Sequence, residues 1–220
     1  MKSRSPNEIS VVLVDDHRMF REQLAHLIER AGDMRVCGAA ENVVEAFSLV
    51  RQVRPSVALV DITLKGASGL ELVKQLRAQK IDVPVLVLSM HEESLYAERA
   101  LRAGANGYIT KHEASAEVLE AIRRVVAGEI YVSQPFMTRM MGKMMGKQPS
   151  AADPIERLTD RELDVFRLLG RGLTGREIGV QLNLGTATVD TYTARIKEKL
   201  HLDNSARLRL EATRWIQQHE

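Results

Sequence analysis

The sequence has a single cysteine, no long apolar run and almost no net charge. One thiol, Cys37, excludes an internal disulfide and a multi-cysteine metal site, and it fits a reducing compartment. No stretch approaches the roughly 20 apolar residues of a membrane span. The apolar run at 11–14 behind the basic start ends at Asp15 and Asp16, so we expect no signal peptide. These absences predict a cytoplasmic protein.

The net charge is only +2, from 31 basic and 29 acidic residues among 220. Residues 153–220 carry eleven basic and eleven acidic side chains, so this part of the chain is neutral as a whole. Bulk charge therefore does not indicate nucleic-acid binding. Such a function must rest on a motif and on a local basic patch.

The first 130 residues alternate short apolar runs with amphipathic stretches, which predicts strands alternating with helices. The expected strands lie at 11–14, 35–39, 57–60, 85–88 and 107–110, and the expected helices near 17–30, 42–52, 69–79, 94–103 and 115–127. Several strands are apolar throughout, as in a parallel sheet that helices cover on both faces. Five such units predict a doubly wound α/β fold of the flavodoxin type, whose ligand site lies outside the carboxyl ends of the strands.

Polar residues follow four of the five predicted strands. Asp15 and Asp16 follow the first, Asp61 the third, and Ser89 and Lys111 the fourth and fifth. In the strand order 2-1-3-4-5 they meet at one edge of the sheet. Three carboxylates so close repel each other unless a cation joins them, and Mg²⁺ suits such oxygen ligands. Asp61 can then act as a nucleophile that forms an acyl phosphate, while Lys111 and Ser89 bind the phosphoryl oxygens. An aspartate behind a strand is usually only a cap, but five matches together favour the functional interpretation.

Residues 131–153 differ from the segments on either side and indicate a linker. Five methionines at spacings i, i+3, i+4, i+7 and i+8 form one apolar stripe on a short helix: Met137, Met140, Met141, Met144 and Met145. We interpret the stripe as the side of a linker helix that lies on the protein's own domains, or as an adaptable dimer or interdomain contact; membrane binding is a third alternative. The run from Gln148 to Pro154 is typical of a flexible connection.

After Pro154 the pattern is helical throughout. Thr159 and Glu162 have the spacing of a capping box, which predicts the start of a first helix. Further helices are expected near 174–182, 186–199 and 205–218, which makes a small all-α bundle of four helices. The short turn at 183–185 is suited to the corner of a helix-turn-helix motif.

Residues 9–130 resemble the receiver domain of response regulators. The resemblance rests on V-V-L-V-D-D-H, A-L-V-D-I-T-L-K-G-A-S-G-L-E, V-L-V-L-S-M-H and A-G-A-N-G-Y-I-T-K. It implies that Asp61 is the phosphoacceptor. It implies a Mg²⁺ site formed by Asp15, Asp16, Asp61 and the backbone carbonyl of Thr63. It also implies a phosphoryl-binding switch formed by Ser89, Lys111 and Tyr108. The resemblance also implies that Tyr108 changes rotamer when Ser89 moves; the alternative is a plain aromatic at the edge of the sheet.

Two positions depart from the receiver pattern. Receivers usually carry Met-Pro where this chain has Leu64 and Lys65, so a rigid turn is lost and a cation is added near the pocket. This departure bears on the geometry of the loop and on the lifetime of the phosphoryl group. Many receivers also have Pro after the pocket lysine. Here that residue is His112, which we interpret as a solvated residue at the start of a helix.

Residues 158–212 resemble the LuxR-type helix-turn-helix domain of NarL/FixJ regulators. The matching text is L-T-D-R-E-L-D-V-F-R-L-L, then G-L-T-G-R-E-I-G-V-Q-L-N-L-G-T-A-T-V-D-T-Y-T-A-R-I-K-E-K-L. The resemblance implies that the third helix docks in the major groove of DNA. On that helix the pattern directs Val189, Ile196 and Leu200 to the core. This leaves the opposite side of the helix for DNA.

The outward residues of the third helix are the predicted DNA contacts: Thr188, Asp190, Thr191, Ala194, Arg195 and Lys199. A local basic patch accompanies them, with five basic residues between 195 and 209: Arg195, Lys197, Lys199, Arg207 and Arg209. Asp190 stands where the family usually carries lysine. A carboxylate there costs attraction to phosphate, but it can accept a hydrogen bond from N4 of cytosine.

Together these features predict a transcription regulator of a two-component phosphorelay, switched by phosphorylation of Asp61, and not an enzyme. The predicted organisation is a receiver domain at 9–130, a linker at 131–153 and a helix-turn-helix domain at 154–219, with the motif itself at about 174–193. The predicted cofactor is Mg²⁺. The predicted partners are a sensor histidine kinase, DNA with two half-sites, a second copy of the chain after phosphorylation and, as a further candidate, RNA polymerase.

Three other functions share part of these features. A phosphatase of the haloacid dehalogenase type needs a second acid two residues after the nucleophile, but position 63 is Thr. A quorum-type regulator would share only the DNA-binding half and would not need the acid cluster. A receiver-like domain that no longer takes phosphate stays open because of Lys65; its DNA binding would be constitutive or controlled by a protein partner.

Overall fold

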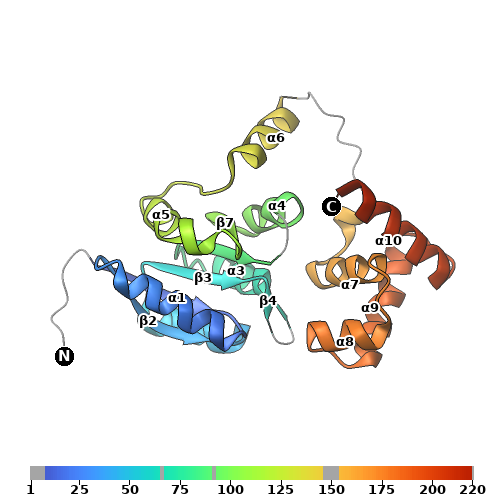
Figure 1. Cartoon of the computed structure of the whole chain (residues 1–220), viewed down its shortest axis with the longest axis horizontal. Helices are drawn as coiled ribbons and strands as arrows, with labels where there is room; N and C mark the ends of the chain where they lie inside the picture. Colours follow the sequence, from blue (N-terminus) through green and yellow to red (C-terminus); the bar gives the residue numbers. More distant parts are fainter. Residues whose placement is uncertain (1–7, 65–66, 91–92, 146–153, 220) are drawn as a thin grey trace. The chain divides into compact units, whose positions relative to one another are not determined.

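A computed structural model describes residues 8–64, 67–90, 93–145 and 154–219 of the chain (Figure 1). The chain divides into two compact units, Met1–Met137 and Thr138–Glu220. None of the helices in these described segments combines the length and apolarity that crossing a membrane requires.

The first unit is built on a five-stranded parallel sheet. Its strands are β1 (Ile9–Val14), β2 (Met34–Ala40), β3 (Val57–Asp61), β6 (Val85–Ser89) and β7 (Gly107–Thr110). They are ordered β2-β1-β3-β6-β7, and every neighbouring pair is parallel. This order confirms the predicted flavodoxin-like fold, and each strand falls where an apolar run predicted it.

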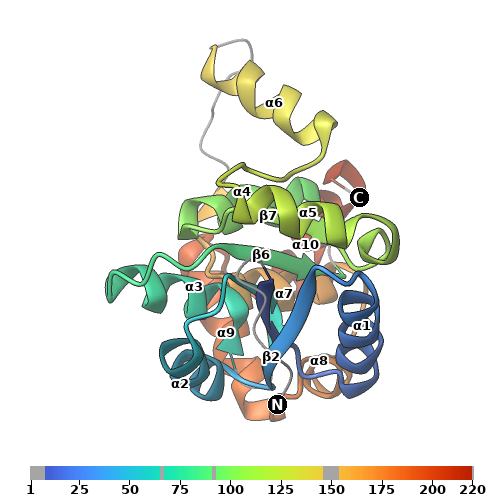
Figure 2. The same ribbon diagram turned by 90° about the vertical axis from the view of Figure 1, so that its left-hand side faces the viewer.

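Helices cover both faces of the sheet, as Figure 2 shows. Helices α1 (Arg18–Arg30) and α5 (Ala114–Val126) lie together on one face, and α2 (Val43–Val53), α3 (Gly69–Ala78) and α4 (Glu93–Ala103) cover the other. Alternate strand residues therefore enter different cores. The core under α1 and α5 includes Leu13, Leu59 and Leu88 from the sheet and Ile28 and Ile122 from the helices. Because both faces are covered, β3 and β6 are buried along their whole length.

A short hairpin that the sequence analysis did not predict follows β3. Strands β4 (Thr63–Leu64) and β5 (Ala67–Ser68) are antiparallel, and the tip that contains Lys65 lies outside the described residues. The chain then turns sharply into α3 at Gly69, whose amide donates to the carbonyl of Ile62 at 2.7 Å. A side chain on Gly69 would overlap the backbone oxygen of Asp61, so only glycine fits there. The hairpin thus returns the chain tightly against Asp61.

The segment that follows α5 is tied to the edge of the sheet. Tyr131 forms a parallel bridge with Gly107; its carbonyl accepts from the amide of Tyr108 at 2.8 Å, and its amide donates to Asn106 O at 3.0 Å. The amide of Ser133 donates to Glu93 Oε1 of α4 at 2.6 Å. Helix α6 (Gln134–Met144) begins directly afterwards. The first residues of the predicted linker therefore form part of the sheet's edge.

The methionine stripe lies on α6, as predicted, and continues one residue past it. Met137 and Met140 are half-buried, whereas Met141 and Met145 are exposed. The side chain of Met144 lies outside the described residues. The role of the stripe stays a prediction.

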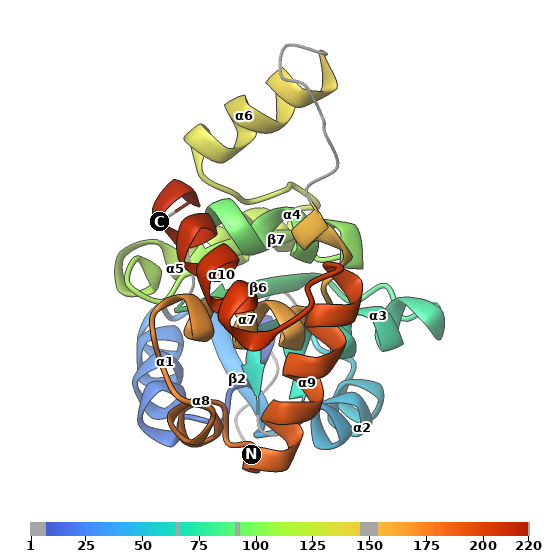
Figure 3. The ribbon, with the colours of Figure 1, turned by 90° about the vertical axis from the view of Figure 1, so that its right-hand side faces the viewer.

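The second unit is helical. After a 3-10 turn (Pro154–Arg157) come α7 (Asp160–Gly170), α8 (Gly175–Leu182), α9 (Thr186–Lys199) and α10 (Ser205–His219) (Figure 3). Capping boxes start α7 and α8, at Thr159 with Glu162 and at Thr174 with Glu177. The turn between α8 and α9 begins at Asn183, which adopts the left-handed conformation at φ 53°. The four helices and the corner lie where they were predicted.

Candidate phosphoacceptor pocket and DNA-recognition helix

The polar residues predicted at the strand ends do meet in the first unit. Asp15 follows β1, Asp61 ends β3, Ser89 ends β6 and Lys111 follows β7. Lys111 Nζ lies 2.6 Å from Asp15 Oδ2 and 2.7 Å from Asp61 Oδ2. All three side chains are nearly inaccessible, with at most 5% of each exposed. The lysine therefore bridges two buried carboxylates in a region where water screens charge poorly.

Burial dominates the electrostatics of Asp61. It raises the pKa of this carboxyl to about 7, against the lowering effect of the Lys111 ammonium and with a further rise from Asp15. The amide of Thr63 donates to Asp61 Oδ1 at 3.3 Å. The other oxygen, Oδ2, faces Lys111. Asp61 is thus a carboxylate whose charge is costly without a further cation.

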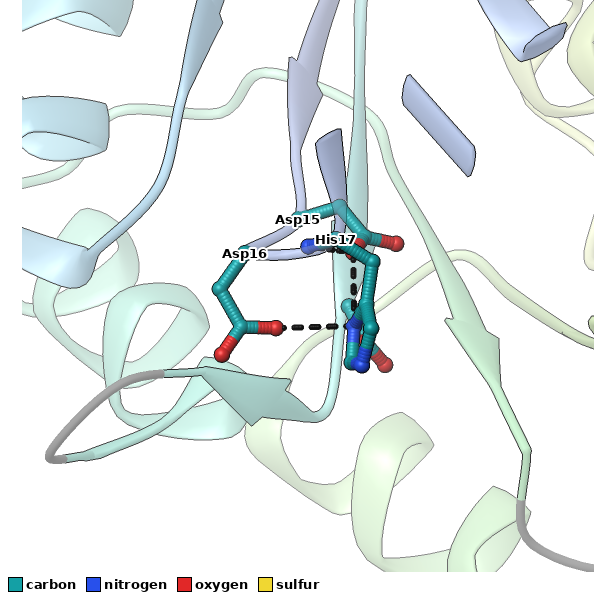
Figure 4. A group of neighbouring side chains, drawn as sticks. Asp15, Asp16 and His17 are labelled. Atoms are coloured by element: carbon teal, nitrogen blue, oxygen red, sulfur yellow. Dashed lines mark hydrogen bonds and ion pairs between the residues drawn. The ribbon is translucent and has the colours of Figure 1, made fainter. Parts of the chain in front are cut away.

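Asp61 belongs to a cluster of three aspartates and one histidine beside Lys111. One ligand atom from each of Asp15, Asp16, His17 and Asp61 lies within 4.8 Å of all the others. Figure 4 shows the His17 ring beside the two aspartates, with Nδ1 2.9 Å from Asp16 Oδ1 and 3.3 Å from Asp15 Oδ1. His17 was not among the predicted site residues. Its side chain is 65% exposed, whereas that of Asp16 is 4% exposed.

The donors in this cluster fit Mg²⁺. The pocket holds three carboxylates and one lysine ammonium, and among the described residues the buried oxygens Asp15 Oδ2 and Asp16 Oδ1 are contacted in ion pairs only. Their close neighbours are the ion-pairing atoms of Lys111 and His17. A hard dication that prefers oxygen ligands would compensate this excess negative charge. The imidazole is a poorer ligand for such an ion, so the fit rests on the aspartates.

Ser89 and Tyr108 lie on the neighbouring strands β6 and β7. Ser89 is fully buried, and its backbone carbonyl accepts from the amide of Lys111 at 2.7 Å. Tyr108 is 1% exposed and pairs with Val87 across the ladder. Of the predicted switch residues, Ser89 is therefore joined directly to the pocket lysine through the backbone. Tyr108 is a buried aromatic on the last strand, next to the segment that contains Tyr131.

In the second unit, α9 has one buried and one exposed side. Val189 and Ile196 are buried, and Leu200 at the C-cap is half-buried. Five predicted DNA-contact residues are exposed: Thr188, Asp190, Thr191, Ala194 and Arg195. A shallow hollow is lined by Ala187, Thr188, Thr191, Tyr192 and Arg195, so Tyr192 joins this face although it was not predicted.

The sixth predicted contact, Lys199, is engaged elsewhere. Its ammonium lies 2.6 Å from Glu162 Oε2, in the capping box of α7, and 3.4 Å from the carbonyl of Arg157. Burial raises the pKa of Glu162, but hydrogen bonds from Lys199 and Thr159 outweigh this effect and bring the pKa below its ordinary value. Arg209 similarly donates to the carbonyl of Leu173 at 2.9 Å. Part of the predicted basic patch thus also holds the bundle together.

Known families and proteins resemble this chain in both halves. The response regulator receiver domain family matches residues 11–123, and the luxR family of bacterial regulatory proteins matches residues 156–212. The transcriptional activator protein ExaE of Pseudomonas putida is 36% identical over 203 residues, which are 91% of this chain and 94% of that protein. The nitrate/nitrite response regulator protein NarL of Escherichia coli is 29% identical over 211 residues, or 95% of each chain.

Solved structures of response regulators share the fold of this chain. A LuxR-family two-component response regulator from Aurantimonas sp. has a TM-score of 0.58 at 33% identity and covers 63% of this chain and 99% of its own. RcsB of Salmonella enterica serovar Typhimurium, solved bound to the promoter rprA in the presence of phosphomimetic BeF3-, shares the fold with a TM-score of 0.59 at 20% identity, covering 94% of this chain and 99% of its own. The chain belongs to the NarL/FixJ family of two-component response regulators, and it is a DNA-binding transcription regulator controlled by phosphorylation.

Proposed function

We propose that Asp61 is the residue that accepts the phosphoryl group. The observation that carries this proposal is its position: a buried carboxylate at the end of the central strand β3, within 2.7 Å of the Lys111 ammonium and beside Asp15 and Asp16. In the reaction an Oδ atom of Asp61 attacks phosphorus. The bond from phosphorus to the donor's leaving group breaks, and an acyl phosphate forms. The proposed donor is the phosphohistidine of a sensor kinase.

Asp15, Asp16 and Asp61 would hold Mg²⁺, with the backbone carbonyl of Thr63 as a further ligand. When bound, the ion neutralises charge on the transferring phosphoryl group. Lys111 exchanges Asp61 Oδ2 for a phosphoryl oxygen, and the hydroxyl of Ser89 donates to another. Tyr108 responds when Ser89 moves, and so carries the change to the edge of the sheet. These steps convert a local charge into a shift of population between conformations.

The output of this switch is DNA binding through α9. Thr188, Asp190, Thr191, Ala194 and Arg195 would face the major groove, with Lys199 at the end of the same helix. Support comes from their exposure opposite the buried Val189 and Ile196. We propose that the active form is a homodimer on two half-sites in the cytoplasm, with RNA polymerase as a further candidate partner. The protein would act as a regulator and not turn over a substrate.

The test is phosphorylation of the full chain. Incubation with Mg²⁺ and acetyl phosphate should add one phosphoryl group by intact mass, and Asp61→Asn should remove this addition. Asp33→Asn is the matched control because Asp33 is an exposed aspartate, paired with Arg123 away from the pocket. Unmodified wild-type protein under these conditions would favour the alternative of a receiver that no longer takes phosphate. A stable phosphate that persists in Asp61→Asn would show that another residue is the nucleophile.

A further inference from the structure

An aromatic ring lies against the pocket lysine. Phe20 is half-buried in the first turn of α1 and packs against the core that α1 and α5 share with the sheet. Lys111 Nζ lies 4.6 Å from the centre of the Phe20 ring. The same ammonium contacts Asp15 and Asp61. It is therefore held by two carboxylates and one aromatic face.

The ring and the carboxylates hold the ammonium in different ways. A lysine has four flexible carbons between backbone and charge, so its ammonium needs neighbours that fix its position. The face of a phenyl ring attracts a cation and more so where water is excluded, as around this side chain with 5% exposure. Unlike a third carboxylate, the ring adds no negative charge that would repel an incoming phosphoryl group. The ring would continue to attract the ammonium when it leaves Asp61 Oδ2 for a phosphoryl oxygen.

We propose that Phe20 is a positioning residue for phosphorylation: it acts through Lys111 by keeping the ammonium at Asp61. The proposal rests on the assignment of Asp61 as phosphoacceptor. It requires the aromatic face of Phe20, and not only the volume of its side chain. An apolar side chain of similar size fills the same space but lacks the attractive face, so Phe20→Leu should disturb the lysine without emptying the site.

The experiment measures the rate of phosphorylation of the full chain by acetyl phosphate at saturating Mg²⁺, followed by intact mass. Phe20→Leu should slow the reaction about 3- to 10-fold, and Phe20→Tyr, which keeps the ring, should restore a rate near that of the wild type. Phe47→Leu is the matched control because Phe47 is also half-buried beneath a cation, Arg51 at 5.7 Å, but lies on α2. Its rate should equal that of the wild type.

A double-mutant cycle separates positioning from packing. In a Lys111→Met background the further change Phe20→Leu should have no effect on the residual rate, because the cation on which the ring acts is gone. Mg²⁺ affinity by calorimetry should be the same in Phe20→Leu as in the wild type.

The proposal is overturned if Phe20→Leu reacts as fast as the wild type, if Phe20→Tyr is equally slow, or if the effect persists without Lys111. A misfolded Phe20→Leu, detected by circular dichroism, is replaced by Phe20→Met, which makes the same predictions. If the wild type is not phosphorylated, the assignment of Asp61 fails and this proposal fails with it.

Discussion

Asp61 illustrates how burying a carboxylate in the proposed phosphoacceptor pocket lowers the stability of the fold at neutral pH. Its pKa of about 7 means that the folded chain binds the proton more tightly than the unfolded chain, in which an aspartate has its ordinary pKa of 3.8. The contribution of Asp61 to the free energy of unfolding is therefore most favourable below about pH 4, where the carboxyl is protonated in both states. This stabilising contribution is lost as pH rises through about 7. The metal-free protein thus carries an electrostatic cost at neutral pH that bound Mg²⁺ would relieve.

The stability of Asp61→Asn should show this cost directly. An amide does not ionise, and Lys111 keeps Asp15 as a partner at 2.6 Å. In EDTA the variant should be more stable than the wild type, and the difference should grow by about 2 kcal/mol between pH 5.5 and 8. Urea titrations of the unfolding of the receiver domain, followed by circular dichroism, measure this difference in the free energy of unfolding. Asp33→Asn should show no such growth, because Arg123 holds the pKa of Asp33 below its ordinary value. A pH-independent difference for Asp61→Asn would contradict the raised pKa.

Asp190 places a negative charge on the face that α9 would present to DNA. Its side chain is exposed, and a carboxylate there repels the phosphate backbone whatever the base sequence. We expect Asp190→Ala to tighten binding about 3- to 10-fold on operator and random duplexes alike at low salt. Gel-shift titrations at two salt concentrations measure this effect. Loss of preference at a single base pair, without tighter binding, would instead show that Asp190 reads a cytosine.

Among the elements, the long regular ones followed from the sequence because their packing imposes a recognisable pattern of apolar residues. Strands β3 and β6 are covered on both faces, so they appear as apolar runs, and parallel strands must place Asp61 and Lys111 at one edge. The β4–β5 hairpin has strands of two residues, too short for any period. The contacts between Phe20 and Lys111 and between Lys199 and Glu162 depend on how helices lie beside other elements. Spacing within one helix does not determine that position.

The segment after α5 shows the same limit and leads to a prediction. Residues 131–153 were predicted to form a linker, yet Tyr131 pairs with β7 and Ser133 is held by Glu93. We propose that the receiver extends to about residue 137, where the first compact unit ends. Replacing Glu93 with alanine leaves the half-buried amide of Ser133 without its carboxylate acceptor. Hydrogen exchange at this amide should then accelerate about 10-fold in the full chain.

Glu120→Ala is the control for this change, because Glu120 is an exposed glutamate on α5. It should leave exchange at Ser133 and Tyr131 as in the wild type. If Glu93→Ala also leaves Ser133 unchanged, the carboxylate does not hold this segment, and the boundary near 130 is the better description.

At the scale of the whole molecule, a phosphate on one unit must change what the other does on DNA. Helix α9 has 14 residues, and only a few of its exposed side chains would reach base edges, so one copy would read a short sequence. Two copies gain both specificity and affinity if their half-sites lie on the same side of the duplex. Phosphorylation that favours a dimer therefore raises affinity for paired half-sites far more than for a single one.

This coupling can be tested by changing the DNA and the protein together. With beryllofluoride and Mg²⁺, the wild type should bind a duplex with two half-sites at least about 10-fold more tightly than a duplex with one. Inserting about 5 base pairs between the half-sites turns one of them to the opposite side and should abolish the gain, whereas about 10 base pairs should restore much of it. Asp61→Asn should bind all these duplexes at the same weak level with or without beryllofluoride. Sedimentation of the same samples should show dimers only where the gain appears. Tight binding that is indifferent to spacing would mean that each copy reads DNA alone, and that phosphorylation acts on α9 within a single chain.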